Sequence, residues 1–93
     1  MKIFFKDVSK GVVDARVIVE LENGIFINEI TILRKQNRFS VEFPEKTFRG
    51  KDNKIHNINI ITFENDDKKT LWEIDILEKH KKWRETNRRV YIL

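Results

Sequence analysis

The sequence predicts an α+β fold in which an antiparallel β-meander of about five strands is followed by a C-terminal amphipathic helix. Apolar and polar residues alternate over the first two-thirds of the 93-residue chain, and turn signals separate these runs. After residue 65 the spacing of the apolar residues becomes helical. None of the first four connections is long enough for a crossover helix, so each strand should pair with its sequence neighbour.

The first two strands follow from alternation and turn chemistry. Residues 3–8 form the first, and Lys10–Gly11 is its hinge to the second. Over residues 13–21 every odd position is apolar, and polar residues such as Asp14 alternate with them, which is typical of a half-buried strand. Asn23–Gly24 then marks a tight hairpin turn.

The next segments complete the predicted sheet, which spans residues 2–63. Residues 25–34 are rich in β-branched side chains, and after a turn the strand 39–43 stops at Pro44, which cannot donate a ladder hydrogen bond. One face of the third strand is expected to carry Phe26, Ile30 and Ile32. Residues 45–54 are expected to form a long polar loop, and strand character returns at residues 55–63.

The last third of the chain predicts a helix over about residues 68–86. Asp66 or Asp67 is the expected N-cap, because acidic side chains favour the positive end of a helix. The apolar stripe that can cover the sheet consists of Trp72, Ile76, His80 and Trp83. Alternation from Trp72 to Ile76 also fits a strand, but the charge-rich continuation does not. The apolar residues 90–93 are expected to pack on a core or on a partner chain.

Length and composition limit the class of protein. The chain should form one domain, 1–93, and at 11.3 kDa a folded monomer should expose about 5,700 Å². The absence of cysteine excludes disulfide scaffolds and cysteine-ligated metals, and neither histidine stands in a ligand motif, so no metal or cofactor is expected. No apolar run could span a membrane or serve as a signal peptide, which predicts a cytoplasmic protein without a membrane partner.

The motifs of catalysis are also missing from the sequence. Neither Ser9 nor Ser40 stands in a glycine-flanked elbow, and the three glycines form no phosphate-binding loop. Adjacent acids such as Asp66 and Asp67 lie among turn residues, where neither burial nor a closed site would suit them to acid–base work. We therefore expect a protein that is not an enzyme and has no small-molecule substrate.

Positive charge is concentrated at the end of the chain. Residues 1–67 hold 11 basic and 11 acidic side chains, so residues 68–93 carry the whole net charge of +4. Between residues 79 and 89 there are six cations and one acid. Clustered cations attract phosphate polymers and release counterions on binding. The alternative is a solvated helix end, where the helix dipole also favours cations.

The order of segments resembles one known family. The residues that carry the resemblance are Ala15, Val19 and Leu21, then Phe26-x-x-x-Ile30-x-Ile32, then Phe39, Val41 and Phe43 running into Pro44-x-Lys46. With the polar loop, the Ile-rich strand and the final helix, the chain resembles the SpoVG family (stage V sporulation protein G, the septation regulators) up to about Trp83. Phe43 stands where that family usually has Met, and residues 57–61 lack its His-Pro run.

The resemblance implies a small bacterial homodimer that binds DNA, and in some cases RNA, as a regulator. The helix and the following segment would take part in recognition. The candidate nucleic-acid-binding residues are Lys46, Arg49, Lys79, Lys81, Lys82, Arg84, Arg88 and Arg89. Lys46 matches the Pro-x-Lys of the family, and the others rest on charge alone. Candidates for contacts to base edges are Arg84, Asn87 and Arg88.

A second hypothesis is a protein–protein interaction module. An open meander has two unpaired edges that can recruit a strand from a partner. The anchor side chains of such a module would be Trp72, Trp83 and Tyr91, since aromatic residues often dominate interfaces.

Overall fold

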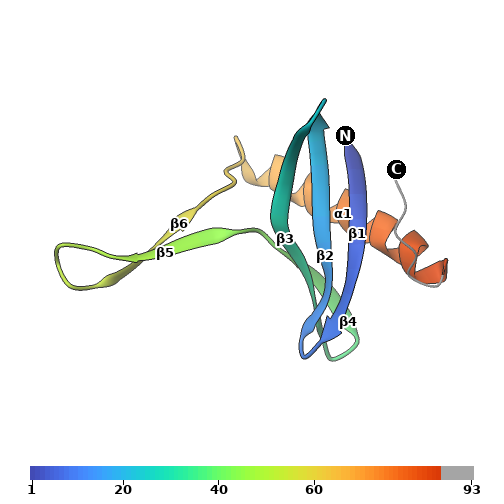
Figure 1. Ribbon diagram of the computed structural model, residues 1–93, viewed down its shortest axis with the longest axis horizontal. Helices are drawn as coiled ribbons and strands as arrows, with labels where there is room; N and C mark the ends of the chain where they lie inside the picture. The colour runs from blue at the N-terminus through green and yellow to red at the C-terminus, as the bar shows by residue number, and fades with distance from the viewer. Residues whose placement is uncertain (87–93) are drawn as a thin grey trace.

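The structure, a computed structural model in which residues 1–86 are described, confirms the α+β fold (Figure 1). Strands β1 (Lys2–Lys10), β2 (Val13–Glu22), β3 (Ile25–Lys35) and β4 (Arg38–Glu42) form an antiparallel sheet in chain order. Helix α1 (Asp66–Glu85) lies behind this sheet in Figure 1. The other face of the sheet is turned toward the reader, and we call it the open face.

A second, two-stranded sheet replaces the predicted polar loop. Strands β5 (Glu45–Arg49) and β6 (Ile55–Asn59) pair antiparallel and project to the left in Figure 1 as an arm, residues 45–59. The prediction of a loop over residues 45–54 was therefore wrong for residues 45–49, and the chain has six strands where about five were expected. All ten strand positions of the arm are exposed, so neither face is buried, and no alternating apolar pattern marks β5 in the sequence, whereas β6 lies within the strand predicted for residues 55–63.

Irregular pairing redirects two side chains away from their predicted faces. The register of β2 on β3 shifts between Val13 and Ala15, and the extra residue, Asp14, turns into the protein with 6% of its surface exposed. Two residues of β3, Asn28 and Glu29, likewise stand opposite one on β2. This bulge moves Phe26 to the open face, away from Ile30 and Ile32.

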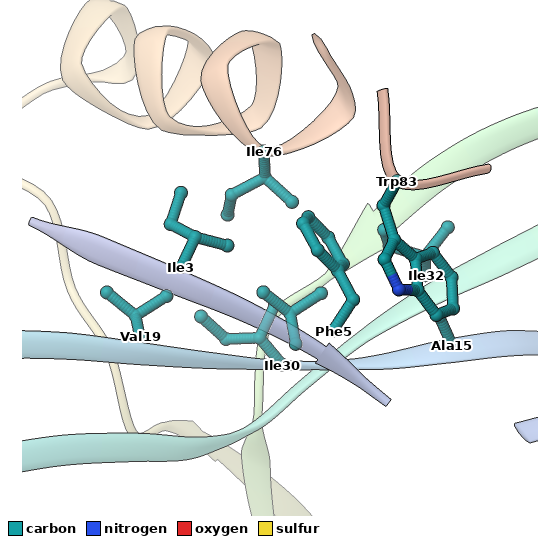
Figure 2. Packing of buried hydrophobic residues seen from close by; sticks show 9 residues of the cluster. Ile3, Phe5, Ala15, Val19, Ile30, Ile32, Ile76 and Trp83 are labelled. Atoms are coloured by element: carbon teal, nitrogen blue, oxygen red, sulfur yellow. The ribbon is translucent and has the colours of Figure 1, made fainter. Parts of the chain in front are cut away.

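The core lies between α1 and the sheet, as Figure 2 shows. Its fully buried members are Ile3, Phe5, Ala15, Val17, Val19, Ile30, Ile32, Ile76 and Trp83. Trp83 stacks on Phe5 with ring centroids 5.4 Å apart. Trp72 packs against the core and against Phe63, so the two tryptophans are not the exposed anchors that an interaction module would need. Tyr91 and the segment 90–93 lie outside the described residues.

The helix begins two residues before the predicted start. Its N-cap is Asn65, not Asp66 or Asp67, because the Asn65 side chain accepts a hydrogen bond from the backbone N–H of Lys68 at 2.9 Å. The two aspartates occupy the first turn, where they still meet the positive end of the helix dipole. The predicted stripe is confirmed, and His80 lies in it fully buried.

Candidate nucleic-acid interface

The predicted contact residues lie in two places at opposite ends of the molecule. Lys46 and Arg49 are on the arm, whereas Lys79, Lys81, Lys82 and Arg84 are in the last turns of α1 (Figure 1). The longest dimension of the structure is 49 Å, and the arm and the end of α1 lie toward its two ends. Arg88, Arg89 and Asn87 fall outside the residues that the structure describes.

The helix cations do not form one surface. Lys79 makes an ion pair with Asp75, with Nζ and Oδ1 2.6 Å apart. Residues three apart share one flank of a helix, so Lys81 lies beside Arg84 on one flank while Lys82 lies beside Lys79 on the other. Lys81 and Lys82 are exposed, and within residues 1–86 neither has a carboxylate within 4.0 Å.

Phe39, on β4, joins the end of the helix to the sheet. The guanidinium carbon of Arg84 lies 4.2 Å from the centroid of the Phe39 ring, and that of Arg34, from β3, lies 5.9 Å from it. Both are cation–π distances. One aromatic ring therefore contacts two arginines from separate elements.

The turn between β3 and β4 adds further positive charge. Lys35 and Arg38 stand directly opposite each other in the ladder, a like-charged pair that destabilises a sheet. The turn residues Gln36 and Asn37 both have positive φ values, 51° and 62°, and the side chain of Asn37 accepts a hydrogen bond from Arg34 at 3.1 Å. The backbone is that of a tight hairpin turn whose two central residues are usually Asn and Gly.

We use the name basic end for the cations of the β3–β4 hairpin and of one flank of the last turns of α1, although strand alternation turns Lys35 and Arg38 to the sheet face opposite that of Arg34 and Phe39. The members of the basic end are Arg34, Lys35, Arg38, Lys81 and Arg84. Sequence reasoning found the two helix residues and missed the three from the hairpin. The sequence does indicate a basic hairpin, because residues 34–38 contain three cations and no acid, but the segment was interpreted only as a turn.

A buried polar chain fixes the helix side of the basic end. Arg84 Nε donates to His80 Nδ1 at 3.2 Å, so the ring proton of His80 lies on Nε2, which donates to Asp14 Oδ2 at 2.7 Å. His80 is fully buried and packs against the rings of Phe5 and Phe39. The bulge that turns Asp14 inward therefore determines where Arg84 lies.

The tip of the arm is organised by a different pair. His56 Nε2 lies 3.0 Å from Asp52 Oδ1, and this contact, with the backbone N–H of Lys54, holds the pKa of Asp52 below its ordinary value of 3.8. Gly50 leaves the room for it, since a Cβ there would stand 2.8 Å from both side chains. Arg49 bonds to the backbone and side chain of Asn53, while Lys46 is exposed.

The described residues contain no group of three or more metal-ligating side chains, and no helix among them is both long and apolar enough to cross a membrane. Comparison of the chain with protein-family models, with curated proteins and with solved structures found no match. The similarity to the SpoVG family thus remains a prediction from the sequence.

Proposed function

We propose that this protein is a non-enzymatic regulator that binds DNA or RNA, and that the basic end is its phosphate-binding surface. The single observation that supports this most is the Phe39 ring, which Arg84 of the helix and Arg34 of the hairpin both contact at cation–π distances. Arginine guanidiniums held this way are well placed to contact phosphate oxygens. The proposal includes a cytoplasmic location.

Two unfavourable features of the β3–β4 hairpin in the free protein also support this proposal. Lys35 and Arg38 repel each other across the ladder, and Gln36 adopts a left-handed backbone that costs about 1–2 kcal/mol for an ordinary residue. A bound phosphate would relieve the repulsion. Local violations of this kind are expected where a surface serves binding rather than folding.

The protein-interaction alternative through a sheet edge has less support. The exposed edge strand β1 carries Lys2, Lys6 and Lys10, and its pairing is irregular between Asp7 and Lys10. Charged side chains and irregular pairing are the features by which natural proteins protect an edge from strand addition.

The test is fluorescence anisotropy with a labelled duplex, a single-stranded DNA and an RNA, each at 50 and 200 mM salt. If about five phosphates are contacted, log K for the duplex should fall with log salt at a slope of about −4 to −5. The double variant Lys35→Glu/Arg38→Glu should bind at least about 10-fold more weakly at low salt and reduce the slope by about 2.

The matched control is Lys51→Glu/Lys54→Glu at the tip of the arm. Both double variants lower the formal net charge from +4 to 0, so a difference between them reports the position of the charge. The control should bind much as the unaltered protein does. Absence of binding to all three probes at low salt, salt-independent affinity, or a larger loss in the arm variant would each overturn the proposal.

A further inference from the structure

The open face of the main sheet carries two neighbouring aromatic rings. Alternate residues of a strand point to opposite faces, so Phe4 lies on the open face while Ile3 and Phe5 enter the core. Phe26 of β3 is 46% exposed, and its ring centroid lies 6.4 Å from that of Phe4. Together with Ile18 of the intervening strand β2, the two rings line a shallow depression of about 460 Å³. Helix α1 lies against the opposite face (Figure 1).

The place of Phe26 beside Phe4 depends on the bulge in β3. Asn28 and Glu29 stand opposite Ile18 alone, and the extra residue turns Phe26 to the open face. Bulges re-aim side chains in this way and are over-represented next to functional sites. Burial of Phe26 in the core would have stabilised the fold, so the bulge gives up that stabilisation and places a second ring at the surface.

Cations lie on the same face as the two rings. Lys6 lines the depression and stands directly opposite Arg16, a like-charged pair that destabilises a sheet. Both are exposed, and within residues 1–86 neither has a carboxylate within 4.0 Å. Thr31 stands opposite Arg16, so alternation along β3 brings the Lys35–Arg38 pair to this face as well. The open face thus carries two like-charged pairs.

Two acids also lie on the open face, but away from these pairs. Glu20 stands between Lys2 and Phe26 in the ladder and accepts a hydrogen bond from the backbone N–H of Gly24, in the β2–β3 turn, at 3.2 Å. Glu42 is on the edge strand β4, where Thr31 separates it from Arg16. Between the rings and the β3–β4 hairpin, cations therefore outnumber acids, which suits an anionic ligand with flat apolar groups.

We propose that the open face binds an unpaired strand of nucleic acid, whose bases stack on Phe4 and Phe26 and whose phosphates contact the Lys6–Arg16 and Lys35–Arg38 pairs. Every base has a π face that an aromatic ring can stack on, and an open four-stranded sheet is one of the surfaces on which proteins stack unpaired bases. A phosphate bound between two cations also relieves their repulsion.

The shape of the ligand follows from these contacts. A duplex exposes base edges in its grooves and keeps the base faces stacked on one another, so it cannot use the two rings. Stacking and phosphate contacts do not involve the 2′-hydroxyl, so DNA and RNA single strands should bind alike. The inference rests on the proposed nucleic-acid binding and adds the place where unpaired bases contact the protein.

The first test is fluorescence anisotropy with a labelled single-stranded DNA, an RNA of the same sequence and the duplex. Phe26→Leu keeps an apolar side chain but removes the ring, so both single strands should bind at least about 5-fold more weakly while the duplex binds as before. Phe26→Trp should retain binding, and stacking should quench the fluorescence of the introduced indole. Phe48→Leu is the matched control, because Phe48 is 41% exposed but lies on the arm, and it should change no affinity.

The second test removes the charge beside the rings. Lys6→Gln/Arg16→Gln should reduce the slope of log K against log salt for the single strand by about 1.4, since each phosphate contributes about 0.7. The melting temperature should not fall, because the change removes a repulsive pair. Lys51→Gln/Lys54→Gln at the tip of the arm removes the same charge and should leave the slope unchanged.

The outcomes separate this inference from the proposed function. If Phe26→Leu binds single strands as the unaltered protein does, while duplex binding still depends on Lys35 and Arg38, the stacking surface is overturned and the proposed function stands. An equal loss for duplex and single strands, or an equal loss in Phe48→Leu, would also overturn the stacking surface. Absence of binding to every probe would overturn both.

Discussion

Replacing His80 by Phe should destabilise the protein strongly although the packing volume is nearly conserved. Phe keeps the ring contacts with Phe5 and Phe39, which lie 5.7 and 4.8 Å away, but it cannot donate to Asp14. Asp14 is 6% exposed, so its carboxylate would lose the imidazole in a poorly hydrated site. Breaking one side of a buried pair costs about 3–5 kcal/mol, and we expect about 3 kcal/mol here because packing is retained.

That loss is a large part of the total stability. A domain of this length has a free energy of unfolding of about 5–14 kcal/mol, and a 3 kcal/mol loss lowers the melting temperature by about 12–24 °C. The assay is urea unfolding followed by tryptophan fluorescence, which reports on Trp72 and on Trp83, whose ring lies 5.7 Å from that of His80. The m-value should be the same for His80→Phe and for the unaltered protein, which would show that both unfold from a native fold of the same extent.

Two further variants make the reasoning refutable. In His80→Phe/Asp14→Ala the carboxylate is also gone, and about 2 kcal/mol of the loss should be recovered. His56→Phe is the matched control, because His56 also pairs with an aspartate but is exposed, so global stability should not change measurably. The buried pair does not stabilise the fold as argued if the free energy of unfolding of His80→Phe is within about 0.5 kcal/mol of that of the unaltered protein. The same holds if the double variant is no more stable than His80→Phe.

Two predictions concern turns. Gly50→Ala should push the His56 ring away from Asp52 and raise the pKa of Asp52 toward 3.8, which a pH titration of the Asp52 carboxyl by NMR would measure. Because that pKa is lowered in the folded protein, the order of the arm tip should be intact above pH 3.8 and be lost as the pH falls through the lower, folded value, with faster amide exchange near Gly50 as the readout. An unshifted titration in Gly50→Ala would contradict the proposed contact. Gln36→Asn should stabilise the protein by about 0.5 kcal/mol, because Asn tolerates the left-handed backbone better, and Gln36→Val should destabilise it. Thermal unfolding separates these outcomes, and equal melting temperatures would argue against strain at Gln36.

The sequence predicted those elements whose burial leaves a periodic pattern. The alternation in β2 and the stripe through Ile76 and Trp83 identified the main sheet and the helix, since each buries one face on the other. Strand β5 was missed because all its residues are exposed and show no alternation, whereas β6 fell within the strand predicted for residues 55–63. The predicted face of Phe26 was wrong because a bulge reverses which residues of a strand point to each face of the sheet. The alternation in a single sequence does not show where a bulge occurs.

The candidate site was only partly predictable for a related reason. Counting charge along the chain groups Lys79 with Lys81 and Lys82, but helix geometry separates them onto two flanks and pairs Lys79 with Asp75. Arg34 comes from β3, about fifty residues earlier, and it shares the Phe39 ring with Arg84 only because Phe39 packs under α1. A contact between residues so far apart in the chain depends on the tertiary fold, so the sequence around either residue does not indicate it.

The bulge at Asp14 connects the stability of the fold to the basic end. Without the extra residue, Asp14 would follow the alternation of β2 to the open face, and His80 would be buried without its acceptor. Since Arg84 is held by His80 on one side and by the Phe39 ring on the other, its guanidinium is preorganised before any ligand arrives.

His80→Phe removes the hydrogen bond from Arg84 to His80, so it should weaken nucleic-acid binding under conditions where the variant is still folded. His56→Phe, which leaves Arg84 untouched, should bind as the unaltered protein does. Equal affinity of both variants would show that the buried chain serves stability alone.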